Sequence, residues 1–157
     1  MEITERVLAG VPAGSVRVPL AEFGSVWRLA EAECVRLVMA TPLGETSREA
    51  SYASAVMKTC RWLAGADVPL GNPADPLWTA PEAPLLPTSG VPIGPAARET
   101  IQYVHEETRY QLSKFPGGYK TPGMPPRPGY LEGVMDTIQW ARLFGHQPQL
   151  EGLPATA

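Results

Sequence analysis

One helical pattern occurs twice in this chain, first as YASAVMKTCRW over residues 52–62 and again as YLEGVMDTIQW over residues 130–140. The copies lie 78 positions apart, and five of their eleven positions carry the same residue. The residues that define the motif are Tyr52, Val56, Thr59, Trp62, Tyr130, Val134, Thr137 and Trp140. Within each copy they are spaced by four, three and three positions, which places them on one face of a helix. The chain therefore carries the same apolar helix face twice.

This repeated face has the chemistry of a packing surface. Its aromatic rings can anchor the face while a hydroxyl or an indole N–H reaches a polar edge. The small residue at its centre, Ala55 or Gly133, lets another backbone approach closely. A single hairpin of helices cannot bury such a stripe, whereas two hairpins can bury each other's. We interpret the residues as a packing motif; a ligand-binding role shared by both copies is the alternative.

Helical periodicity extends beyond the motif and predicts four long helices. Ser47 is a good N-cap before the first copy, and Gly65 is placed to end that helix. Pro95 suits the first position of a later helix. We expect the helices to run from Leu20 to Ala40, from Ser47 to Gly65, from Pro95 to Phe115 and from Pro128 to Gly145. The helices that precede the two motif copies align weakly with each other at an offset of 74, which favours duplication of the whole hairpin.

The fold prediction is an all-α protein of one domain, residues 1–157, built on a four-helix core. Residues 20–65 form the first αα-hairpin, residues 96–145 form the second, and the two are related as a tandem internal repeat. A further short helix is expected over residues 2–9, before the Gly10–Gly14 break.

A proline-rich segment, residues 66–95, joins the two hairpins. Its eight prolines exclude a helix through most of its length, yet it also carries apolar side chains that need a surface to lie on. We expect this strap to pack across the helices of the same chain, with a partner protein as the alternative surface. The candidate partner-binding residues are Leu77, Trp78, Leu85 and Leu86, and Trp78 leads because a stiff segment loses little entropy on binding.

The helices that read Tyr-x-x-(small)-Val-x-x-Thr-x-x-Trp, followed by glycine and then by proline and leucine, resemble uncharacterised small helical proteins of actinobacteria and their phages. The resemblance covers about 20 residues in each copy of the motif. No activity comes with it. It implies an accessory or mobile-element protein of actinobacterial or phage origin.

Composition and charge argue against several classes of function. The net charge is −3, and neither half of the chain is basic, whereas a nucleic-acid binder usually shows a basic patch. No apolar run has the length of a membrane span, and the acidic N-terminus is not that of a signal peptide. Cys34 and Cys60 do not form a disulfide framework and are expected as free, buried thiols. We expect a cytoplasmic protein that binds neither membrane nor nucleic acid.

Catalytic motifs are missing from the sequence. It contains no phosphate-binding glycine loop and no nucleophile elbow. His105-Glu106-Glu107 starts like a zinc-binding His-Glu-x-x-His helix, but position 109 is arginine, and His146 is the only other histidine. The sequence therefore predicts no cofactor, no metal and no catalytic residue, and a small metal- or ligand-dependent enzyme using His105 and nearby acids is the alternative.

The leading functional prediction is a non-catalytic accessory, assembly or immunity-type factor that binds a protein partner or a second copy of itself. Its contact surface would use the strap, the second proline-rich loop over 116–129, or exposed aromatic residues. A DNA-associated regulator is a further alternative, and it would use Arg48, Arg61, Arg127 and Arg142 around the repeated helices.

Overall fold

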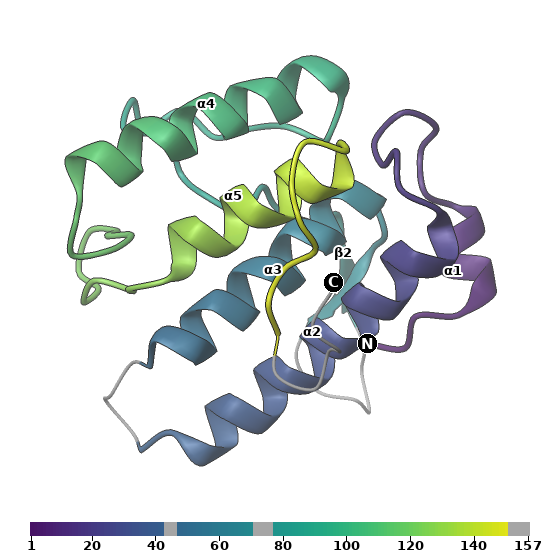
Figure 1. Cartoon of the computed structure of the whole chain (residues 1–157), viewed down its shortest axis with the longest axis horizontal. Coiled ribbons are helices and arrows are strands. Elements are labelled where there is room, and N and C mark those ends of the chain that lie inside the picture. The colour runs from purple at the N-terminus through teal and green to yellow at the C-terminus, as the bar shows by residue number, and fades with distance from the viewer. Residues whose placement is uncertain (43–46, 71–76, 151–157) are drawn as a thin grey trace.

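The computed structural model describes residues 1–42, 47–70 and 77–150, and of residues 68–70 and 77–79 it describes the backbone. Five helices and two short strands lie in these ranges (Figure 1). They are α1 (Glu5–Ala9), α2 (Leu20–Ala40), α3 (Arg48–Ala64), β1 (Val68–Leu70), β2 (Leu77–Thr79), α4 (Arg98–Lys114) and α5 (Tyr130–Ala141). The predicted helical class and the four long helices are confirmed.

Local sequence explains where α3 begins and ends. The Ser47 hydroxyl accepts a hydrogen bond from the backbone N–H of Ala50 at 3.0 Å, which satisfies one of the free donors of the first turn. Gly65 then adopts a left-handed conformation with φ of 64° and ends the helix. Both predicted boundaries of this helix are confirmed.

Three other predicted boundaries are wrong. α4 begins at Arg98 and not at Pro95, because Ala97 is extended and its N–H is bound by the Thr100 hydroxyl at 2.7 Å. α5 begins at Tyr130 and not at Pro128, because Gly129 has a φ of 87°, which no helix accommodates. It also ends at Ala141, before Gly145.

The four long helices pack in the order α2, α3, α5, α4. α3 and α5 form the most extensive helix pair, α2 covers the other side of α3, and α4 packs on α5. Figure 1 shows the two central helices running between the outer pair. The core of the molecule therefore lies between the two segments that carry the repeated sequence pattern.

The motif residues are buried with one exception. Val56, Thr59, Trp62, Tyr130, Val134, Thr137 and Trp140 are buried, and Tyr52 is half-buried. The hydroxyls of Thr59 and Thr137 donate hydrogen bonds to the carbonyl oxygens of Ala55 and Gly133, each at 2.7 Å. A Cβ on Gly133 would lie 2.7 Å from the Tyr52 carbonyl oxygen and 2.8 Å from the Ala55 Cβ. The small residue at the centre of the motif thus permits close approach of α3 and α5.

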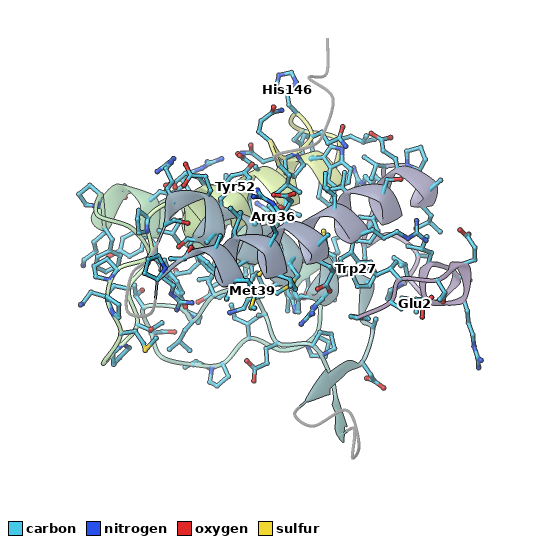
Figure 2. All side chains as sticks on the ribbon, turned by 90° about the horizontal axis from the view of Figure 1, so that it is seen from below. Glu2, Trp27, Arg36, Met39, Tyr52 and His146 are labelled. Atoms are coloured by element: carbon cyan, nitrogen blue, oxygen red, sulfur yellow. The ribbon has the colours of Figure 1, made fainter. Side chains whose placement is uncertain are left out.

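The first part of the proline-rich segment forms a small β-hairpin. β1 and β2 pair antiparallel with Val68 opposite Thr79, Pro69 opposite Trp78 and Leu70 opposite Leu77. Figure 2 shows both strands extending away from the helices. These strands were not predicted, although β-branched and aromatic residues favour them and proline is tolerated in a strand that has a free edge.

Candidate interaction surface

The second part of the proline-rich segment runs along α4 in the opposite direction to the helix. The Gln111 side chain donates to the Leu86 carbonyl oxygen at 2.9 Å, and the Thr88 N–H donates to the Glu107 carboxylate at 2.8 Å. Although burial opposes it, the hydrogen bonds from Thr88 and Gln111 hold the pKa of Glu107 below its usual value. The segment is therefore fixed to α4 by bonds at successive helical turns.

Two other helices, α3 and α5, also bind this segment. The Trp62 indole N–H donates to the Gly94 carbonyl oxygen at 3.1 Å, and the Tyr130 hydroxyl donates to that of Pro84. Leu85 is only 5% exposed and belongs to the hydrophobic core. Both motif copies therefore contribute an aromatic polar group that holds the strap in place.

An apolar strip remains exposed along this seam. Val91 is 66% exposed, and Leu86, Tyr103 and Tyr110 are also exposed. Tyr103 and Tyr110 are seven positions apart, which places them on one face of α4. Val91 and Tyr103 line opposite sides of a shallow groove that also includes Ile93. We call Leu86, Val91, Tyr103 and Tyr110 the strap–α4 face.

The candidate partner-binding residues are distributed over three environments. Leu86 is exposed on the strap–α4 face. The assignment of Leu85 to a contact surface is wrong, because its side chain is buried in the core. Leu77 and Trp78 lie in β2, where the structure describes only the backbone. Val91, Tyr103 and Tyr110 were not among the predicted contact residues, although the spacing of the two tyrosines on a predicted helix could have indicated them.

The second proline-rich loop is organised around an aromatic pair. The rings of Tyr119 and Tyr130 stack with centroids 4.8 Å apart, and the Arg127 guanidinium lies 4.9 and 5.0 Å from the two centroids. The Tyr119 hydroxyl accepts the Leu86 N–H at 2.9 Å. The loop therefore supports the strap, while Pro122 and Pro125 of its PxxP sequence are exposed.

A small cleft of about 280 Å³ lies at the other side of the core, between α2, α3, α5 and the segment that follows α5. At its base the Tyr52 hydroxyl donates to Asp136 at 2.7 Å and accepts the Gln149 N–H at 3.2 Å. Burial and the hydrogen bond to Asp136 raise the pKa of Tyr52 well above its usual value. The hydroxyl keeps its proton at neutral pH and links α3 to α5 and to the segment that follows α5.

The residues of the proposed metal site do not come together. The His105 Nε2 lies 3.3 Å from the Gln139 Nε2, Glu106 accepts from Gln102, and Glu107 holds the strap. Burial, then the charge of Arg109, lowers the pKa of His105. His146 is exposed at the edge of the molecule (Figure 2). Within residues 1–42, 47–70 and 77–150, no three His, Cys, Asp or Glu side chains are grouped to hold a metal ion.

The arginines considered for DNA binding all have contacts within the chain. Arg61 forms a bidentate pair with Glu31 at 2.7 and 2.8 Å, and Arg48 lies 3.6 Å from Glu132. Arg127 lies against the two tyrosine rings, and Arg142 donates to the Gly14 carbonyl oxygen at 2.6 Å. Arg48 and Arg61 lie at opposite ends of α3, Arg127 precedes α5 and Arg142 follows it.

The two cysteines are free thiols on neighbouring helices. Cys60 is buried and Cys34 is half-buried. Burial raises the pKa of both thiols, and a protonated thiol is a poor nucleophile.

In the part of the chain that the structure describes, no helix combines the length and apolar character needed to cross a membrane.

Comparison with known proteins gives no relative: no protein-family model, no curated protein and no solved structure matches this chain. The assignment of function therefore depends on the geometry described above.

Two further exposed apolar residues, Leu143 and Phe144, lie where α5 ends. Leu143 is 64% exposed and Phe144 is 76% exposed. Leu143 has a φ of 67°, in the left-handed region that favours glycine. Its N–H donates to the Trp140 carbonyl oxygen at 2.9 Å, and the Phe144 N–H donates to that of Gln139 at 2.6 Å. These bonds hold the backbone of both residues in a helix-terminating turn.

We expect Leu143→Gly to raise the free energy of unfolding by about 1 kcal/mol, because a left-handed conformation costs leucine roughly that amount and costs glycine little. The exposed leucine side chain contributes little packing that could offset the gain. Urea unfolding followed by circular dichroism measures the difference. Phe144→Gly is the matched control and should lower stability, because Phe144 does not have a positive φ. Equal effects of the two changes would contradict the strain at Leu143.

Proposed function

We propose that this protein is a non-catalytic accessory or assembly factor that binds another protein through the strap–α4 face. The proposal includes an immunity-type role as one form of such protein binding. It also includes a phage or mobile-element origin, which rests on the resemblance of the repeated helices. It also places the protein in the cytoplasm.

The observation that carries the proposal is an exposed apolar strip on a fixed backbone. The strap is bound to α4, α3 and α5 through Leu86, Thr88, Gly94 and Pro84, so a partner would order little chain on binding. Tyrosine is among the residues that contribute most to protein interfaces, and two of them, Tyr103 and Tyr110, stand on this strip. Exposed apolar side chains that gather on one surface favour protein binding, and Val91 and Tyr103 line the same groove.

We further propose that the two hairpins arose by duplication of one unit, and that the eight motif residues act in packing. The shared sequence pattern, the identical bonding of Thr59 and Thr137 to the preceding turn, and the packing of α3 on α5 support this origin. The strap then joins two copies of the unit and supplies the surface that neither copy has alone.

The test compares capture of partners by wild type and by a triple variant, Val91→Ser, Tyr103→Ser and Tyr110→Ser, in lysate of the source organism. All three side chains are exposed, so the variant should keep the circular dichroism of the wild type. We expect one stoichiometric partner with wild type and a loss of at least about tenfold with the variant, since each lost anchor costs on the order of 1 kcal/mol.

Val35→Ser, Val38→Ser and Met39→Ser on α2 form the matched control, because they remove three exposed apolar side chains from another part of the surface. This variant should bind the partner as the wild type does. Sedimentation of the purified proteins detects the case in which the partner is a second copy. Equal loss with both triple variants, or no partner and no self-association, would refute the proposal.

A further inference from the structure

Three segments that are distant in sequence converge where α5 ends. The Arg17 N–H donates to the Ala141 carbonyl oxygen at 2.7 Å, and the Arg142 guanidinium donates to the Gly14 carbonyl oxygen at 2.6 Å. α4, which packs on α5 and begins with Arg98, starts on the side of the molecule where α5 ends (Figure 1). The charges of Arg17 and Arg98 both act on the Arg142 guanidinium. The fold therefore brings Arg17 and Arg98 to the side of the molecule where Arg142 lies.

These three arginines differ from other arginines of the chain in their ion pairing. In the described part of the chain, none of these three guanidinium groups has a carboxylate within ion-pair distance, whereas Arg28, Arg36, Arg48 and Arg61 do. Burial, then the charges of Arg17 and Arg98, lowers the pKa of Arg142. Like charges held together in a protein of net charge −3 create a local field that attracts anions.

The exposed residues Leu143 and Phe144 directly follow Arg142 in the sequence. They stand on the turn that ends α5, whose backbone is fixed by bonds from the two residues to Trp140 and Gln139. Arg142, Leu143 and Phe144 are consecutive, so a ligand that pairs with the arginines also meets two apolar side chains. Observed strain at an exposed residue, here the positive φ of Leu143, is often found at binding sites.

We propose that Arg17, Arg98 and Arg142, together with Leu143 and Phe144, form a docking site for an acidic segment of a partner protein that carries an apolar anchor residue. Arginine forms paired hydrogen bonds with carboxylates, and the Leu143–Phe144 pair receives the apolar side chain. A nucleic acid is the less suitable ligand, because the other arginines near the repeated helices are engaged within the chain and the protein is acidic overall. The site shares no residue with the strap–α4 face, although α4 contributes to both.

The test titrates the full-length protein into a fluorescent peptide in which Glu and Asp alternate with Leu and Trp, and reads anisotropy. We expect saturable binding that weakens as salt is raised, because screening reduces contacts between exposed charges. Arg17→Glu with Arg98→Glu should weaken binding by about tenfold or more, since each exposed ion pair is worth up to about 1 kcal/mol. Phe144→Ser should weaken binding of the same peptide. It should not weaken binding of a peptide variant that lacks Leu and Trp.

Arg6→Glu with Arg109→Glu is the matched control, because both are exposed arginines and the change in net charge is the same. It should bind the peptide as the wild type does, apart from a small general loss. The triple variant of the strap–α4 face should also bind it normally, which separates this proposal from the proposed function. Equal loss with both charge reversals, no binding by wild type, or tighter binding of a single-stranded oligonucleotide of equal charge would overturn it.

Discussion

Replacing Trp62 with alanine is expected to lower the free energy of unfolding by about 4 kcal/mol, which is the usual cost of removing a large aromatic side chain from a core. Trp62 is completely buried, and its indole N–H also holds the Gly94 carbonyl oxygen of the strap. The loss therefore includes both a cavity and an anchor of the strap. Urea unfolding followed by far-ultraviolet circular dichroism measures it without depending on the removed fluorophore.

Trp62→Phe separates the two contributions. It keeps most of the buried volume but removes the donor to Gly94, so we expect a loss of only about 1–2 kcal/mol. Limited proteolysis should nevertheless cut the strap around residues 86–97 faster than in the wild type, because this bond is one of those that fix it. If Trp62→Ala costs less than about 1 kcal/mol, the indole does not occupy the core as described.

Gly133→Ala is expected to lower the free energy of unfolding by about 2 kcal/mol, against the usual benefit of replacing a helical glycine by alanine. The new Cβ would lie 2.7 Å from the backbone oxygen of Tyr52 and 2.8 Å from the Ala55 Cβ. Neither atom can rotate away, so α3 and α5 must move apart along their most extensive contact. Thermal and urea unfolding of the purified variant measure the change.

Gly24→Ala provides the control, since Gly24 is also a buried glycine inside a long helix. Its new Cβ would meet the side-chain carbons Cδ1 and Cδ2 of Leu8 at 2.6 and 3.1 Å, and a leucine side chain can turn aside. We expect a change within about 0.5 kcal/mol of zero, because the gain in helix propensity offsets a small repacking cost. A loss as large as that for Gly133→Ala would show that the α3–α5 approach has no special importance.

Much of the helical core could be predicted from local sequence. The spacing of Tyr52, Val56, Thr59 and Trp62 marks a buried helix face because apolar side chains on a helix recur every three or four positions. Ser47 and Gly65 mark the ends of α3 through caps that act within a few residues. These signals are short in range, so they survive without knowledge of the tertiary structure.

The surface features depend on contacts that the sequence does not encode locally. A proline-rich segment has no helical or strand period, so nothing in it distinguishes Leu85, which is buried, from Leu86, which is exposed. Arg61 pairs with Glu31, which lies far from it in the chain. The charges of Arg17 and Arg98 likewise act on the distant Arg142. Their charges could be counted from the sequence, but their partners could not be named.

The packing of α3 against α5 also has a kinetic consequence. These helices begin 82 positions apart, at residues 48 and 130. Their contact, the most extensive between the described helices, forms only when the long stretch of chain between them closes into a loop. Closing a long loop costs chain entropy before any favourable contact is made, and folding slows as contacts become more distant in sequence. We therefore expect this protein to fold more slowly than helical bundles of equal size whose neighbours in sequence are neighbours in space.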